Sequence, residues 1–90
     1  MDEAPTRFCT DPAGELLSLY YHDGTVVLQA NTSVFRVYAG QLAGQSTIFR
    51  DLFHFGKAEA GEMYDGCPLV HLHDDPLDLW YFLKAVHEHR

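Results

Sequence analysis

Cysteine, basic residues and long apolar runs are all scarce in this chain of 90 residues. The two cysteines, Cys9 and Cys67, lie too far apart in sequence to suggest a metal knuckle or a redox dithiol. Six basic residues against 13 acidic ones give a net charge of -7, which disfavours nucleic acid and anionic membranes as partners. Without a membrane-spanning run or a signal-peptide pattern, we expect an intracellular protein, cytoplasmic or nuclear.

What the sequence does contain is enough apolar material for a folded core. Hydrophobic residues make up 47% of the chain and aromatic residues 13%, which is typical of a globular domain. Residues 1–14 carry Pro5, Pro12 and Gly14 with little apolar content. We therefore expect a flexible N-terminal lead-in over residues 1–14 and one folded domain over residues 15–90.

A β-hairpin is predicted in the first half of the domain, where two short runs alternate between apolar and polar residues. One face of this hairpin collects Val26, Leu28, Ala30, Phe35 and Val37. The segment 31–33 supplies turn residues between the two runs. Because one face is uniformly apolar, we expect it to point towards the core.

Helical patterns and one further strand follow the hairpin. After a short helical piece around residues 42–43, Ser46 is a good N-cap for an amphipathic helix. Its apolar arc comprises Ile48, Phe49, Leu52, Phe53 and Phe55. Gly56 ends the helix, and the stretch up to Gly66 reads as a solvated loop. Residues 69–73 are then predicted to form a third strand of the same sheet, with one core face.

The last predicted helix begins at Asp75, a good N-cap, with Pro76 at the first helical position. Its core stripe comprises Leu79, Phe82, Leu83 and Val86. A second apolar surface on the same helix comprises Leu77, Trp80 and Tyr81. Either a partner protein or further helices outside this chain would cover that second surface. The overall pattern predicts an α+β fold with sheet and helices in two layers.

Residues suited to chemistry occur in one place only. His71 and His73 follow Cys67 closely and offer ligand types that zinc accepts, so a small metal-binding or thiol-dependent enzyme is the alternative hypothesis. No second ligand pair with finger-like spacing accompanies them, and nothing resembles a nucleophile elbow. We therefore expect no catalytic residues, no metal and no cofactor.

Several segments carry a family resemblance in their order and spacing. They are residues 23–30, 35–37, 42–43, Ser46 with 49–53, and 65–72. Together they resemble a BTB/POZ domain, above all the divergent type abundant in mushroom-forming fungi, over about residues 21–86. The resemblance implies a hairpin and a third strand packed with short helices. Because the family continues with further helices, it also implies a domain that is incomplete at its C-terminus.

The resemblance implies function as well as fold. BTB domains are protein-interaction modules that form dimers or higher oligomers, and some are substrate adaptors for cullin-based ubiquitin ligases. No cofactor or catalysis belongs to the family. The helix that begins at Asp75 would correspond to one whose outer face contributes to cullin recognition in adaptor members. We therefore expect protein partners to be bound through Phe55, Leu77, Trp80 and Tyr81.

Overall fold

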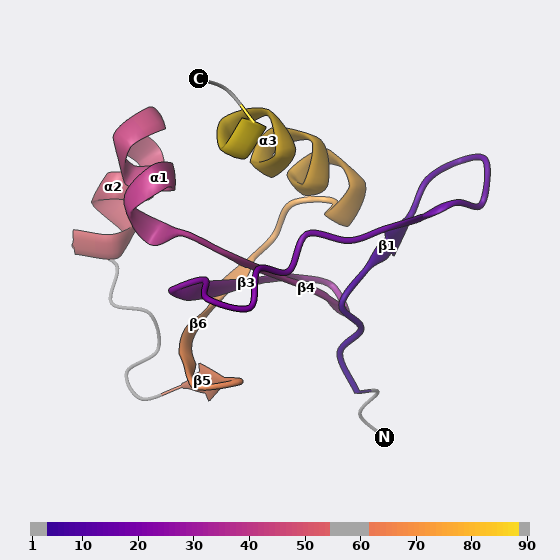
Figure 1. Ribbon diagram of the computed structural model, residues 1–90, viewed down its shortest axis with the longest axis horizontal. Helices are drawn as coiled ribbons and strands as arrows, with labels where there is room; N and C mark the ends of the chain where they lie inside the picture. The colour runs from indigo at the N-terminus through magenta and orange to yellow at the C-terminus, as the bar shows by residue number, and fades with distance from the viewer. Residues whose placement is uncertain (1–3, 55–61, 89–90) are drawn as a thin grey trace.

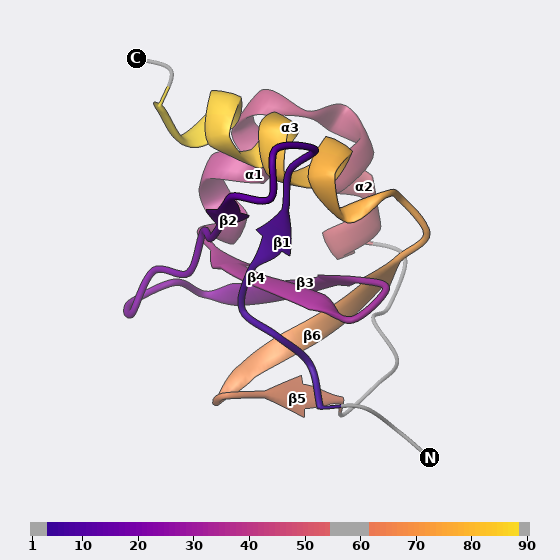
Figure 2. The ribbon, with the colours of Figure 1, turned by 90° about the vertical axis from the view of Figure 1, so that its right-hand side faces the viewer.

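The structure, a computed structural model, describes residues 4–54 and 62–88. The elements follow one another as β1 (Cys9–Thr10), β2 (Leu16–Leu17), β3 (Val26–Ala30), β4 (Ser33–Val37), α1 (Ala39–Gln45), α2 (Thr47–His54), β5 (Met63–Tyr64), β6 (Cys67–Leu72) and α3 (Pro76–Glu88). A mixed sheet lies below the three helices (Figure 2). The predicted α+β class is therefore confirmed.

The main sheet has the strand order β4-β3-β6-β5 (Figure 1). Strands β3 and β4 form the predicted hairpin, in which Ala30 pairs with Ser33 across a tight turn. Asn31 occupies the left-handed region there, with φ of 54°, a conformation that asparagine tolerates better than most residues. Strand β6 runs parallel to β3, with Val27 opposite Leu69. The prediction of a third strand in this sheet is therefore confirmed.

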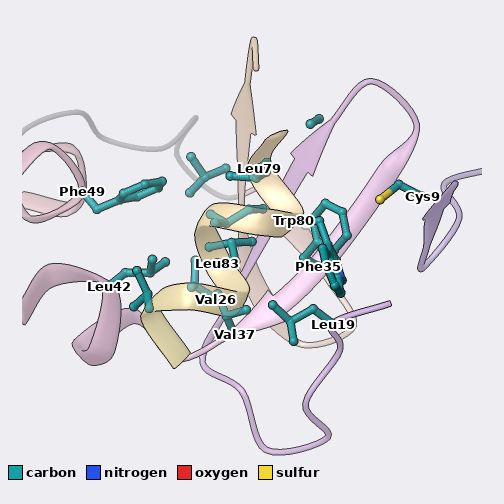
Figure 3. Close-up of a cluster of buried hydrophobic side chains, with 14 residues drawn as sticks. Cys9, Leu19, Val26, Phe35, Val37, Leu42, Phe49, Leu79, Trp80 and Leu83 are labelled. Carbon is teal, nitrogen blue, oxygen red and sulfur yellow. The ribbon is translucent and has the colours of Figure 1, made fainter. Parts of the chain in front are cut away.

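The main core lies between the sheet and the helices. All five apolar residues of the predicted hairpin face are buried in it, which confirms the expected orientation of the hairpin. Leu42 of α1, Phe49 of α2 and Leu83 of α3 reach this core from the helical layer (Figure 3). Their convergence with the sheet residues buries the apolar surface that drives folding.

The opposite face of the sheet carries a second, smaller cluster. It comprises Val27, Val34, Cys67 and Leu69, all buried, with Tyr20 and Tyr64 packed against them. The expectation that the strand around residues 69–73 has a single core face is therefore wrong at Leu69. Because two tyrosine rings cover this face, apolar side chains on both sides of the central strands are removed from water.

Gly24 is required by a close approach between backbone segments. A Cβ atom at this position would lie 2.9 Å from the carbonyl oxygen of Val37 and 2.8 Å from the Cγ atom of Arg36. Backbone atoms of a central hairpin cannot move aside easily, so any other residue at position 24 would force the two segments apart.

The N-terminal segment belongs to the fold, whereas a flexible lead-in over residues 1–14 was expected. Strand β1 pairs with β2, and the Cys9 side chain is only 7% exposed. The backbone N–H of Val34 donates to the carbonyl oxygen of Thr6 at 2.8 Å, and the N–H of Tyr21 donates to that of Arg36 at 2.9 Å. Folded structure therefore begins before Leu16, because these segments satisfy the free edge of β4.

A network of polar contacts connects this N-terminal segment to the turn between β5 and β6. The Arg7 guanidinium lies 4.2 Å from the centre of the Tyr20 ring. The Asp65 carboxylate accepts hydrogen bonds from the Tyr20 hydroxyl at 2.7 Å and from Arg36 at 3.0 Å. The Tyr20 hydroxyl, with help from Arg7 and Arg36, lowers the pKa of Asp65. Burial, together with the carboxylate of Asp65, raises the pKa of Tyr20 to about 12.

Part of the predicted loop before Gly66 is a strand. Strand β5 pairs with the start of β6 across Asp65 and Gly66, which have φ values of 54° and 81°. An Asp-Gly pair is the usual sequence of such a two-residue turn, so the signal was present in the sequence. The expectation of a loop is therefore wrong at residues 63–64, and its part over residues 57–61 lies outside the described residues.

Candidate protein-interaction site

Helices α2 and α3 leave a hollow of about 470 Å³ between them. Its apolar lining consists of Ile48, Phe49, Leu52, Leu72, Leu79 and Phe82, and we call this hollow the α2–α3 groove. One wall comes from α2, the other from α3, and Leu72 at the end of β6 contributes the floor. The volume is within the range of roughly 300 to 1,000 Å³ that is typical of binding sites.

The wall from α2 depends on how this helix begins. The Ser46 hydroxyl accepts the backbone N–H of Phe49 at 3.3 Å, and its carbonyl oxygen accepts the N–H of Arg50 at 3.0 Å. The prediction of an N-cap at Ser46 is therefore confirmed. The Phe49 ring points from α2 towards α3 (Figure 3) and is buried.

Ile48, by contrast, is 76% exposed, so the interpretation of the whole predicted apolar arc as the inner side of the helix is wrong at this residue. Successive residues of a helix point about 100° apart. A helix that packs through Phe49 at the edge of the core therefore leaves Ile48 at the rim of the groove. Of the remaining predicted arc, Leu52 packs partly against the core, whereas the side chains of Phe53 and Phe55 lie outside the description.

The wall from α3 begins at the predicted N-cap. One carboxylate oxygen of Asp75 accepts the backbone N–H groups of Leu77 at 3.0 Å and of Asp78 at 3.2 Å. Pro76 is the first helical residue, as predicted. Further along α3, the Phe82 ring stacks on the Phe49 ring of α2, with the ring centres 5.7 Å apart. Phe82 is nevertheless 40% exposed, so its assignment to the core stripe is wrong.

The residues expected to bind partners have different surroundings. Trp80 is only 9% exposed, and its indole N–H donates to the carbonyl oxygen of Ser18 at 3.0 Å. Leu77 packs against the main core. Tyr81 is 55% exposed and meets Trp80 edge-on. Phe55 lies outside the described residues.

At Leu77 and Trp80, the second apolar surface predicted on α3 is thus covered by the chain itself, whereas Tyr81 stays exposed. The N-terminal segment runs along that side of the molecule from the sheet up to α3 (Figure 2), so neither a partner nor further helices are needed to bury Trp80. Of the members of the predicted set that the structure describes, Tyr81 is the one with a large exposed ring. The sequence gives no sign that residues 6–19 would take this position.

Acidic residues line one end of the α2–α3 groove. They are Asp74 and Asp75, which precede α3, and Asp78 in its first turn. The carboxylate of Asp75 is engaged as the N-cap. Within residues 4–54 and 62–88, Asp74 and Asp78 take part in no ion pair. This end of the groove therefore presents negative charge beside an apolar surface.

The groups behind the alternative hypothesis do not converge on one site. The Cys67 thiol is buried and donates to the carbonyl oxygen of Gly24 at 3.4 Å. His71 is exposed and lies 2.9 Å from the Glu62 carboxylate, and His73 is exposed as well. Among the residues that the structure describes, no group of three His, Cys, Asp or Glu side chains is arranged to hold a metal ion.

The other thiol is no better placed for nucleophilic chemistry. Burial, reinforced by the carboxylates of Asp75 and Asp11, raises the pKa of the Cys9 thiol. A thiol with a raised pKa stays protonated at neutral pH and is a weak nucleophile. The described cysteines are therefore better suited to packing than to catalysis.

Comparisons with known proteins add no assignment. A scan against protein-family models and searches of the curated proteins and of the solved structures found no match.

None of the helices within the described residues combines the length and the apolar character that crossing a bilayer requires.

Proposed function

We propose that this chain is a protein-interaction module of the BTB/POZ type, which binds other proteins in the α2–α3 groove. The order of elements supports the family. A hairpin is followed by two short helices, by a strand that returns parallel to the first hairpin strand, and by a longer helix. The resemblance led us to expect a hairpin and a third strand packed with short helices over residues 21–86, and this order of elements agrees with it.

The observation that carries the proposed function is the exposed apolar surface at the groove. Ile48 and Phe82 lie on opposite walls and remain open to water. Burying a large apolar side chain fully contributes roughly 1.5 to 3 kcal/mol. A ligand that covers Ile48 and Phe82 therefore gains part of this energy at each of the two residues. A concave apolar surface between two helices is suited to a protein segment.

The proposal extends to the two activities that the resemblance implies. One is assembly of the chain into dimers or higher oligomers, and the other is recognition of a cullin as a ubiquitin-ligase adaptor. It assigns the chain no catalytic residue, no metal and no cofactor. The Cys67 thiol is buried, whereas the His71 and His73 side chains are exposed, so their arrangement does not favour the alternative of a metal-binding or thiol-dependent enzyme.

Site-specific photo-crosslinking tests whether the groove contacts other proteins. We would place a photoreactive phenylalanine analogue at position 82, and as control at position 16, because Leu16 is another exposed apolar residue far from the groove. We expect discrete protein adducts from position 82 that are lost when Ile48→Glu is added. Equal adducts from both positions, or none from position 82, would contradict the proposed function.

The adaptor activity needs a different measurement. Binding of a purified cullin N-terminal region can be followed by calorimetry with the unmodified chain and with Tyr81→Ala. Tyr81 is the suitable residue because it is exposed, whereas Trp80→Ala would damage the core. We expect the variant to bind more weakly while it keeps its fold. Light scattering of the same samples reports the oligomeric state. A strictly monomeric chain that does not bind the cullin region would contradict both self-assembly and the adaptor activity.

A further inference from the structure

We infer that the α2–α3 groove receives an amphipathic helix from another protein, whose apolar side lies on Ile48 and Phe82 and which places a lysine or arginine beside Asp74 and Asp78. This inference rests on the proposed function and names the chemistry of the partner. It depends on the shape of the groove, on its acidic end and on the charge of the whole chain.

The shape of the groove favours a helix as occupant. Two helices form its walls, and a third helix packs into such a space at the usual distance of about 8 to 10 Å between helix axes. A helix places apolar side chains on one side at positions i, i+3, i+4 and i+7, so one helix can contact both walls at once. The exposed side chains of Ile48 and Phe82 on these opposite walls are the contacts it would cover.

The acidic end of the groove determines the charge of that helix. The N-terminus of α3 carries a partial positive charge equivalent to about half an elementary charge, which the Asp75 cap and Asp78 more than offset. Asp74 adds a further carboxylate at the same end. Since neither Asp74 nor Asp78 is ion-paired within the described part of the chain, a cation of the partner can approach them without displacing another.

A second copy of this chain is a poorer occupant than a basic partner. Each copy has a net charge of -7 and would bring its own acidic groove end into the interface. Two acidic groove ends that meet in an interface at the groove repel each other, whereas a basic helix is attracted to the groove from a distance. The apolar walls and the charge therefore favour the same class of ligand.

Two synthetic helical peptides test this inference on the full chain. Both carry the same leucine side, and their polar side consists of lysine in one peptide and glutamate in the other. Backbone amide shifts of the labelled chain report where each peptide binds, and titration gives its dissociation constant. We expect the lysine peptide to shift the signals of Ile48 and Phe82 and to bind at least tenfold more tightly than the glutamate peptide.

Variants of the chain separate the apolar and the charged contributions. Ile48→Glu should weaken the lysine peptide at least tenfold, because it puts an unpaired charge into the apolar contact. Asp74→Asn and Asp78→Asn should each weaken it about two- to fivefold, and high salt should weaken it as well. The controls Leu16→Glu and Glu15→Gln change an apolar and an acidic residue outside the groove and should leave binding unchanged.

Several outcomes would overturn the inference. They are equal binding of the two peptides, shifts confined to other surfaces, or equal weakening by Glu15→Gln and Asp78→Asn. A dimer in light scattering that Ile48→Glu dissociates would identify a second copy as the occupant instead. If photo-crosslinking from position 82 captures proteins while the lysine peptide fails to bind, the proposed function stands and only the basic helix is refuted.

Discussion

The two sides of helix α3 make an instructive comparison, because both are apolar and only one is filled. On one side, the N-terminal segment buries Trp80 and accepts its indole hydrogen bond at Ser18. On the other side, α2 approaches through Phe49 but leaves Phe82 partly open and Ile48 at the rim. The same helix therefore contributes to the core on one side and to a candidate binding surface on the other.

The difference shows that apolar residues on a helix do not by themselves identify a binding surface. Trp80 and Phe82 are both large and lie two positions apart, yet their exposure depends on which segment packs against them. An open surface is therefore recognised only after the contacts of every segment are known. The two sides of α3 should therefore respond differently to substitution.

The largest effect is expected from Trp80→Ala. The substitution removes a buried indole ring and its hydrogen bond, so the free energy of unfolding should fall by about 3 to 5 kcal/mol. Urea unfolding measures this loss. The neighbouring exposed residue supplies the control, because Tyr81→Ala should cost less than about 1 kcal/mol. Equal losses for the two variants would show that the N-terminal segment does not cover Trp80.

A smaller effect concerns the attachment of that N-terminal segment at high pH. Because the pKa of Tyr20 is raised to about 12 from an ordinary value of 10.0, its contribution to stability is complete below pH 10. The contribution is lost as the pH rises from 10 to about 12, since the unfolded chain releases the proton more readily.

The pH dependence of urea unfolding, measured for the unmodified chain and for Tyr20→Phe, tests this. The free energy of unfolding of the variant should fall less between pH 10 and 12 than that of the unmodified chain. At neutral pH the variant should be less stable, because it lacks the hydrogen bond to Asp65. Tyr81→Phe, which alters an exposed ring on α3, is the control. An unchanged decline in the Tyr20→Phe protein would mean that this hydroxyl is not held by Asp65.

The smallest effect is expected on the open side. Ile48→Ser should change the free energy of unfolding by no more than about 0.5 kcal/mol, because Ile48 is 76% exposed and serine and isoleucine have similar helix propensities. Thermal and urea unfolding both report this value. A loss above 1.5 kcal/mol would place Ile48 in a packed contact and remove one wall of the groove.

Several elements could be predicted because their signals are local. The hairpin face from Val26 to Val37 and the N-caps at Ser46 and Asp75 follow from residue type and spacing alone. The turn at Asp65 and Gly66 has an equally local signal, although we expected a loop there. The groove is different. The acidic residues at the start of α3 can be seen in the sequence. That they lie in one groove with Ile48 of α2 cannot, because the two helices are brought together only by the fold.

The sequence alone determined the α+β class, the buried face of the β3–β4 hairpin and the acidic character of the chain, because these depend on residue type and on neighbouring residues. The three-dimensional structure was needed to establish that residues 6–19 cover the β4 edge and Trp80, and that Ile48 and Phe82 stay open. Burial at those positions depends on segments far away in sequence. Local periodicity tells which side of an element is apolar, whereas packing between distant segments decides which of those sides is hidden from water.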